Sequence, residues 1–212
     1  MRLDHVSYVA SHDQISDVVN RIGSQIGTAF VDGGIHPKFG TRNFTAPLLN
    51  GQYIEIVCPL DHPATDQTPY GKAVRKKVDE GGGWLTWVVQ VDKISNLESI
   101  YGRKSALGNR ILPSGQILEW KQIGLLNVLD DFTFPYFIEW ISHIHPSQLS
   151  EPKAEISKLV FVEKNNFGQV LPEISNILDS LQEVKPEKKL YFSEKGLIQV
   201  GFKINNRLVY ID

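Results

Sequence analysis

The chain has 212 residues, of which 42% are hydrophobic and 22% charged, so it can bury a substantial core and is not a disordered chain. Its 22 Lys and Arg residues nearly balance 24 Asp and Glu residues, and the formal charge of −2 argues against a nucleic-acid-binding surface. A single cysteine, Cys58, excludes an internal disulfide framework. The sequence lacks a signal-peptide pattern at Met1–His5 and any apolar run as long as a membrane span. We therefore expect a cytoplasmic protein that contacts neither nucleic acid nor membrane.

Residues 1–80 predict a strand, a helix and three further strands. The opening segment LDHVSYVA, residues 3–10, is rich in β-branched and aromatic residues, which is typical of a strand. Hydrophobic residues at helical spacing follow in residues 11–27. The dipeptide Asn50-Gly51 favours a tight hairpin turn. The three further strands are predicted at 29–32, 43–49 and 52–57, with a short helix at 70–78.

Residues 81–150 repeat this order after the turn signal Gly81-Gly82-Gly83. The pattern predicts a strand at 84–91, a helix at 92–101, and strands at 110–112, 116–121 and 136–141. In the closing strands, Ile54-Glu55-Ile56 of the first unit matches Ile138-Glu139-Trp140 of the second. The sequence therefore predicts two related βαβββ modules.

Residues 151–212 predict a third, smaller unit of the same kind. Its elements are a strand at 158–163, an amphipathic helix at 167–181, and strands at 190–193, 197–203 and 207–211. Its first strand has no histidine and its last strand no acidic residue, so we expect a structural role. Because a lone unit of this kind leaves one sheet face exposed, we expect it to pack edge to edge against the second module or against another chain, as a homodimer.

Two pairs of polar residues occupy the first and last strands of the two modules. His5 and Glu55 are 50 positions apart, and Thr86 and Glu139 are 53 positions apart. Since alternate side chains of a strand share a face, each glutamate has aromatic or β-branched neighbours on its own face. A buried carboxylate is costly unless it is paired, hydrogen-bonded or metal-bound. The two glutamates are therefore candidates for a functional site.

The paired units, with LDHVSYVA opening the first and QYIEIV and YFIEWI closing the two, resemble the vicinal oxygen chelate superfamily of glyoxalases, bleomycin-resistance proteins and extradiol dioxygenases. The stretch GGIHPKFGTRNFTAPLLNGQYIEIVCP and the later FPYFIEW resemble its glyoxalase-like domain proteins. The resemblance extends over residues 1–145. It implies an α+β fold in which two paired βαβββ modules form a cleft; a smaller C-terminal βαβββ-like unit follows.

The resemblance also implies a divalent metal held by side chains from the first and last strand of each module. The matching positions are His5, Glu55, Thr86 and Glu139, and the sequence departs from the family at Thr86, where metal-dependent members usually have histidine. His5, Glu55 and Glu139 remain as predicted ligands, a set that suits Zn, Ni, Mn or Fe completed by water. We expect no organic cofactor, and we predict Glu139 as the catalytic general base.

Substrate contacts are predicted from a second group of residues. The segment His36-Pro37-Lys38-Phe39-Gly40 suggests a fixed loop, and the donors near it would bind a carboxylate or another oxygen-rich group at the mouth of the cleft. Residues on the strand faces of the proposed site would form its walls. The predicted substrate-binding residues are His36, Arg42, Asn43, Trp84, Thr86 and Phe137.

Three classes of function remain open from the sequence. The first is a metal-dependent lyase or isomerase acting next to a carbonyl of a small oxygenated metabolite. The second is a metal-free protein that binds and sequesters a small molecule, as resistance proteins of the superfamily do. The third is a degenerate scaffold whose third unit mediates dimerisation. The two glutamates favour the first class over the third, whereas the missing fourth ligand and the neighbouring aromatic residues favour the second.

Overall fold

The computed structural model describes residues 1–131, 133–163, 168, 171–185 and 196–212. The first module has the predicted order of strand, helix and three strands. The 3₁₀ turn η1 (Leu49–Gly51) joins the last two strands, and the positive φ angles of Asn50 (61°) and Gly51 (68°) explain why the Asn-Gly dipeptide stands there. Its elements are β1 (Arg2–Val9), α1 (Ile15–Ile26), β2 (Val31–His36), β3 (Thr41–Pro47) and β4 (Tyr53–Pro59).

The second module follows after two helices, α2 (Pro63–Gln67) and α3 (Pro69–Asp79), each of which begins with a proline that fits the first helical turn. Two helices, α2 and α5, were not predicted from the sequence. The elements of this module are β5 (Gly83–Gln90), α4 (Ser95–Tyr101), β6 (Ala106–Ile111), β7 (Ile117–Ile123), α5 (Leu125–Asp130) and β8 (Tyr136–Trp140).

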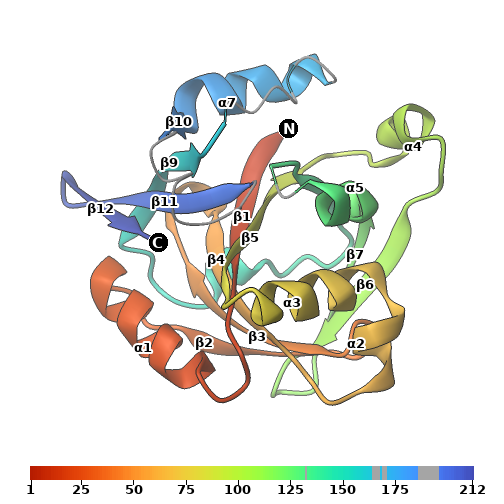
Figure 1. The fold of residues 1–212 in the computed structure, drawn as a ribbon, viewed down its shortest axis with the longest axis horizontal. Coiled ribbons are helices and arrows are strands. Elements are labelled where there is room, and N and C mark those ends of the chain that lie inside the picture. The colour runs from red at the N-terminus through yellow and green to blue at the C-terminus, as the bar shows by residue number, and fades with distance from the viewer. Residues whose placement is uncertain (132, 164–167, 169–170, 186–195) are drawn as a thin grey trace.

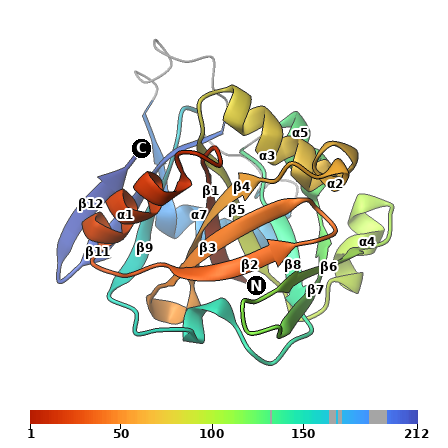
Figure 2. The same ribbon diagram turned by 90° about the horizontal axis from the view of Figure 1, so that it is seen from below.

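The eight strands of the two modules close into a barrel with the order β1-β4-β3-β2-β6-β7-β8-β5. One seam is the long antiparallel pairing of β1 with β5. The other joins β2 to β6 through the pair Ile35 and Ile111 (Figure 2). The backbones approach closely there because Gly34 has no side chain: a Cβ atom at Gly34 would lie 1.8 Å from the carbonyl oxygen of Ile111. The predicted α+β fold is confirmed.

The C-terminal unit forms a separate four-stranded sheet with the order β10-β9-β11-β12. The strand predicted at 190–193 and part of the helix predicted at 167–181 fall outside the described residues. Short 3₁₀ turns, η2 (Pro146–Gln148) and η3 (Pro172–Ile174), lie in the connections. The elements described are β9 (Ala154–Phe161), α7 (Ser175–Leu181), β10 (Gln182–Val184), β11 (Leu197–Ile204) and β12 (Arg207–Ile211).

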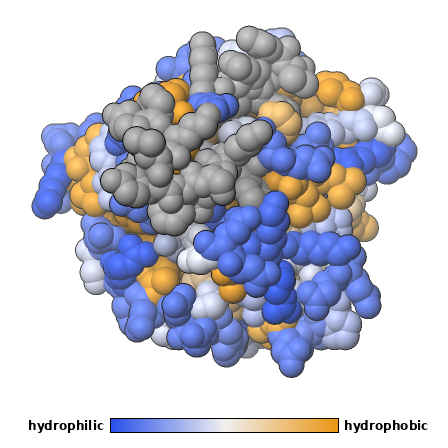
Figure 3. Space-filling view, in the orientation of Figure 1, coloured by the Kyte–Doolittle hydropathy of each residue, from blue (hydrophilic) through white to orange (hydrophobic). Residues whose placement is uncertain are grey.

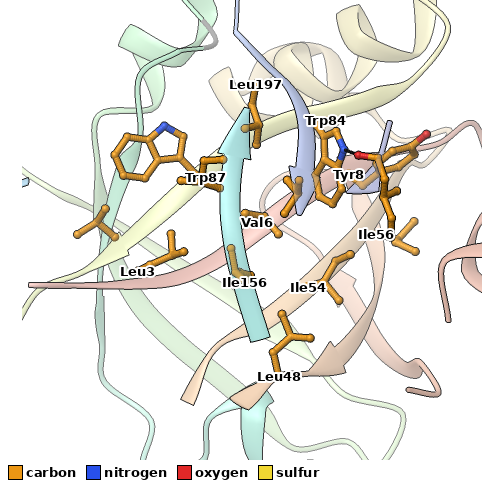
Figure 4. Packing of buried hydrophobic residues seen from close by; sticks show 14 of the residues in the cluster. Leu3, Val6, Tyr8, Leu48, Ile54, Ile56, Trp84, Trp87, Ile156 and Leu197 are labelled. Carbon is orange, nitrogen blue, oxygen red and sulfur yellow. Dashed lines mark hydrogen bonds between the residues drawn. The ribbon is translucent and has the colours of Figure 1, made fainter. Parts of the chain in front are cut away.

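This sheet packs against the outer face of the barrel, as Figures 1 and 4 show. The indole Nε1 of Trp84 donates a hydrogen bond of 2.8 Å to the carbonyl oxygen of Ile211, and its ring lies edge-on to Tyr8 and against Phe202. Within the described residues, no strand of one sheet pairs with a strand of the other. The expected edge-to-edge packing against the second module is therefore wrong: the contact is made by faces, because the outer face of β1, β4 and β5 is itself apolar. Edge-to-edge packing against another chain stays a prediction.

The barrel strands are buried on both faces. Every residue of β4 is buried, since its inner face meets the barrel interior and its outer face meets α1 and the C-terminal sheet. Helix α3 packs on one end of the barrel, where Tyr70 and Val74 join Val9 and Val57 (Figure 1). Among the described residues on the side of the molecule in Figure 3, hydrophilic side chains predominate and hydrophobic ones form separate patches. Among the described residues, no helix has the length and apolarity needed to cross a bilayer.

Candidate functional site

A polar cavity lies inside the barrel. Its free volume is about 20 Å³, room for about one water molecule, within a larger recess of about 350 Å³ that includes the open mouth. Charged, polar and aromatic side chains from both modules and from α3 line it: His5, His36, Phe39, Tyr53, Glu55, Tyr70, Arg110, Trp120, Gln122, Tyr136, Ile138 and Trp140. The interior of the barrel is therefore the candidate site.

Glu55 is held at the cavity wall by three hydrogen-bond donors. Its carboxylate accepts bonds from Ser7 Oγ (2.8 Å), Asn43 Nδ2 (2.6 Å) and the Tyr70 hydroxyl (3.0 Å). Burial by itself would raise the pKa of Glu55, but the positive potential of His36 and His5 and the donated hydrogen bonds outweigh it and place the pKa below the ordinary value. Glu55 is thus a fixed anion with a weak tendency to accept a proton.

His5 is oriented by Asp4 and opens toward the cavity. Its Nδ1 lies 2.9 Å from Asp4 Oδ2, and its Nε2 lies 3.3 Å from the Tyr136 hydroxyl. Although burial opposes ionisation of Asp4, hydrogen bonds from His145 and His5 keep its pKa well below the ordinary value. Asp4 therefore holds Nδ1 of His5, and Nε2 faces the Tyr136 hydroxyl in the cavity wall.

A chain of polar contacts leads from this pair to the surface. The other oxygen of Asp4 lies 3.0 Å from Nε2 of His145, whose Nδ1 lies 2.7 Å from Ser147 Oγ in turn η2. The side chain of His145 is 13% exposed, whereas that of Asp4 is fully buried. Asp4 therefore connects the buried His5 to a group that reaches solvent.

His36 occupies the opposite side of Glu55. Its Nδ1 lies 2.9 Å from Thr41 Oγ1 and its Nε2 lies 3.9 Å from a Glu55 oxygen. Burial lowers the pKa of His36 to about 4, with a further contribution from the positive charge of Arg110. The imidazole is therefore neutral at neutral pH.

Arg110 on β6 places a positive charge in the cavity wall. It is 2% exposed, and within the described part of the chain its Nε and Nη2 atoms have no hydrogen-bond partner. Gly33 leaves space beside it, since a Cβ atom there would lie 2.9 Å from Nη1 of Arg110 and 2.2 Å from Oδ1 of Asn43. A buried guanidinium with free donors is costly in a folded protein, which makes Arg110 a candidate functional residue.

The structure does not bring Glu139 to His5 and Glu55. Glu139 Oε2 accepts a hydrogen bond of 2.8 Å from the backbone N–H of Ile94, and its Oε1 lies 3.6 Å from Lys121 Nζ. Its neighbours in the strand, Ile138 and Trp140, are the residues that line the cavity. Glu139 therefore lies on the outer face of β8, and its predicted roles as metal ligand and general base are wrong.

The register of the modules explains this error. His5 pairs with Tyr53, and Val88 pairs with Tyr136, so the first and last strands of both modules are offset by the same 48 positions. Aligning the modules on the two cavity tyrosines places Val88 at the position of His5. The same alignment places Ile138, not Glu139, at the position of Glu55. The second module thus has apolar residues at both equivalent positions.

Trp84, Thr86 and Phe137 do not line the cavity either. Trp84 lies in the layer under the C-terminal sheet, and Phe137 packs against Tyr101 in the same outer cluster. The hydroxyl of Thr86 donates to the carbonyl oxygens of Trp87 and Phe134. A register shift in the β1–β5 pairing, between Ser7 and Tyr8, reverses the alternation of β5 before Trp84. Their predicted contacts with substrate are therefore wrong.

Of the substrate-binding residues predicted in and near the loop at 36–40, some belong to the cavity and one does not. His36 lines the cavity, and Asn43 acts behind it by holding Glu55. Arg42 instead forms an ion pair with Asp32 and lies over the ring of Phe44, with 39% of its side chain exposed. Arg42 is therefore not a cavity residue, and Arg110 provides the cation of the site.

The donor set does not fit the divalent metal that the superfamily implies. Both oxygens of Glu55 already accept protein hydrogen bonds, and both nitrogens of His5 have polar partners. Within the described residues, no three His, Cys, Asp or Glu side chains are grouped as metal ligands would be. The predicted ligand set of His5, Glu55 and Glu139 is therefore not assembled.

Paired βαβββ modules that surround a polar interior site define the fold of the vicinal oxygen chelate superfamily. The sequence matches the family described as "Glyoxalase-like domain" over residues 3–174, and the chain belongs to that family. A search of curated proteins finds no match.

Solved structures share the fold at low sequence identity. A hypothetical protein from Staphylococcus aureus aligns with a TM-score of 0.56 and 16% identity, covering 98% of this chain and 83% of its own. A methylmalonyl-CoA epimerase from Mycobacterium tuberculosis aligns with a TM-score of 0.44 and 15% identity, covering 65% of this chain and 86% of its own. At these identities the likeness concerns the fold alone.

Most residues of the site that sequence reasoning missed carry no distinguishing local pattern. Arg110, Tyr70, Tyr136 and Asp4 stand in segments that read as ordinary strand or helix. The one available signal was the histidine-aspartate neighbour pair at the start of the chain, because Asp4 directly precedes His5. Whether such side chains reach the cavity depends on which face of each strand turns inward, and closure of the barrel determines that face.

Proposed function

We propose that this glyoxalase-like protein is a lyase or isomerase that moves a proton on the carbon next to a carbonyl of a small metabolite, without a metal. The observation that carries this proposal is the Asp4–His5 pair, in which Nε2 of His5 faces the polar cavity beside the Tyr136 hydroxyl. A histidine whose other nitrogen is held by a carboxylate is a common general base.

In the proposed reaction, Nε2 of His5 accepts the proton from the carbon next to the carbonyl. The C–H bonding pair forms the carbon–carbon double bond of an enolate, and the carbonyl π pair moves to oxygen. Burial holds the pKa of Tyr136 well above its ordinary value, so its hydroxyl stays protonated and can donate to that oxygen. Return of the proton to the same carbon completes the exchange. In a substrate whose α-carbon carries a hydroxyl, the enolate oxygen takes up that hydroxyl proton and the proton on His5 returns to the former carbonyl carbon, so that the α-carbon becomes the new carbonyl.

Glu55 has a different role in this proposal. Its lowered pKa and its three hydrogen bonds make it a poor base, so it fixes Tyr70 and the adjoining wall instead. Nε2 of His5 faces a recess with an open mouth, through which the proton taken from the substrate exchanges with solvent. Solvent deuterium is therefore expected to enter the substrate.

The test is deuterium incorporation followed by proton NMR. Pyruvate, dihydroxyacetone and glyceraldehyde are each incubated with the protein in D₂O, with His5→Gln as the inactive variant and Glu139→Gln as the matched control. We expect exchange with at least one compound, a loss of about 10²-fold or more in His5→Gln, and no change in Glu139→Gln. Equal exchange rates with the wild-type protein and with His5→Gln would contradict the proposal.

A second candidate function is sequestration of a small molecule without turnover. Six aromatic rings in the cavity wall favour it, those of Phe39, Tyr53, Tyr70, Trp120, Tyr136 and Trp140. This function predicts that a compound which raises the melting temperature undergoes no deuterium exchange.

A further inference from the structure

The guanidinium of Arg110 has two free donors that form one edge of its planar fork. Nε and Nη2 point the same way from the guanidinium carbon, and these are the two atoms that have no hydrogen-bond partner within the described chain. Two parallel N–H groups match the two oxygens of a carboxylate in a bidentate pair. The remaining nitrogen, Nη1, faces the space beside Gly33.

The neighbours of Arg110 do not supply this carboxylate. Glu55, the acidic residue of the cavity wall, is held by Ser7, Asn43 and Tyr70, and the neutral imidazole of His36 lies 3.9 Å from it. The outer arginine, Arg42, has Asp32 as its partner. The two arginines therefore differ: Arg42 has a protein carboxylate, whereas Nε and Nη2 of Arg110 are buried without a hydrogen-bond partner among the described residues.

We infer that Arg110 binds the carboxylate of a small ligand, and that this carboxylate enters the barrel cavity first. The inference deepens the proposed function by naming the substrate class, a small carbonyl compound that also bears a carboxylate. The rest of the ligand then lies toward the mouth, within the aromatic wall.

The burial of Arg110 has a second consequence. An unpaired buried charge destabilises the folded protein, so removal of the charge is expected to stabilise the ligand-free protein. A purely structural arginine would behave in the opposite way. The melting temperature without ligand therefore separates the two roles.

The experiment measures the melting temperature and the binding of pyruvate, with lactamide as the uncharged probe and inorganic phosphate as the tetrahedral anion. The variants are Arg110→Met, which removes the charge, Arg110→Lys, which keeps the charge but not the fork, and Lys121→Met, which removes a cation from the outer face of β7. We expect pyruvate to raise the melting temperature of wild type and Lys121→Met, and lactamide to have no effect.

Arg110→Met is expected to melt above the wild type without ligand and to lose the response to pyruvate. Arg110→Lys is expected to bind pyruvate about tenfold more weakly or worse, because one charge-assisted hydrogen bond of the pair is lost. An unchanged pyruvate response in both Arg110 variants, absence of any response in the wild type, or tighter binding of phosphate than of pyruvate would overturn the inference. Binding by the wild type without deuterium exchange would reject the proposed reaction and leave the carboxylate site standing.

Discussion

The closing strands of the two modules, β4 and β8, look alike in sequence and differ in the structure. In β4, Glu55 faces the cavity and is held by three donors, whereas in β8, Glu139 faces outward to Lys121 and the N-terminal end of α4. A shift of one residue in a strand moves a side chain to the opposite face. The site therefore takes its acidic group from the first module and its cation, Arg110, from the second.

The largest expected effect comes from removing each glutamate in turn. Glu55→Ala leaves the buried donors of Ser7, Asn43 and Tyr70 without their acceptor, which is expected to lower the free energy of unfolding by roughly 3 kcal/mol or more. Glu139→Ala removes one hydrogen bond from a backbone N–H and a partly exposed ion pair. We expect it to lower the free energy of unfolding by about 1 kcal/mol or less. Urea unfolding of both variants measures the difference, and equal losses would contradict the assignment of faces.

Acidification is expected to affect the first module through His36. Its pKa in the folded protein is about 4 against the ordinary value of 6.5, so between these values the unfolded chain binds a proton that the folded chain does not. Stability is therefore lost as the pH falls from 6.5 to 4, by about 3 kcal/mol in total.

Urea unfolding between pH 7 and pH 4 tests this dependence. The variant His36→Gln is the control and is expected to lose less stability over the same range, because the titrating group is absent. A wild-type curve parallel to that of the variant would show that His36 does not titrate in this way.

A smaller effect is expected at Trp84, which the sequence placed in the site and the structure places under the C-terminal sheet. Trp84→Phe removes the hydrogen bond to Ile211 and is expected to lower the free energy of unfolding by about 1 kcal/mol. Because Trp84 does not line the cavity, binding of pyruvate is expected to stay unchanged. A large loss of pyruvate binding, measured by calorimetry, would show that Trp84 belongs to the site.

The sequence predicted the fold better than the site for a physical reason. Alternation of β-branched and polar residues located most strands, and Asn50-Gly51 located the hairpin. The same alternation also predicted which residues of β8 share a face. It did not predict which face turns inward, because barrel strands such as β4 are buried on both sides and have no polar outer face.

Arg110 is a second case that the local sequence could not predict. Its strand is short, and nothing in the residues around it distinguishes a buried arginine from an exposed one. Its burial follows from closure of the barrel at the β2–β6 seam and from the missing side chain at Gly33. Those are long-range features, and a local pattern does not contain them.

The most direct test of the central claim is one diffraction experiment on crystals soaked with pyruvate and MnCl₂, with data collected where manganese scatters anomalously. The account predicts pyruvate in the barrel, its carboxylate on Nε and Nη2 of Arg110, and no anomalous peak beside His5 and Glu55. A manganese peak ligated by His5 and Glu55, with no pyruvate on Arg110, would contradict it.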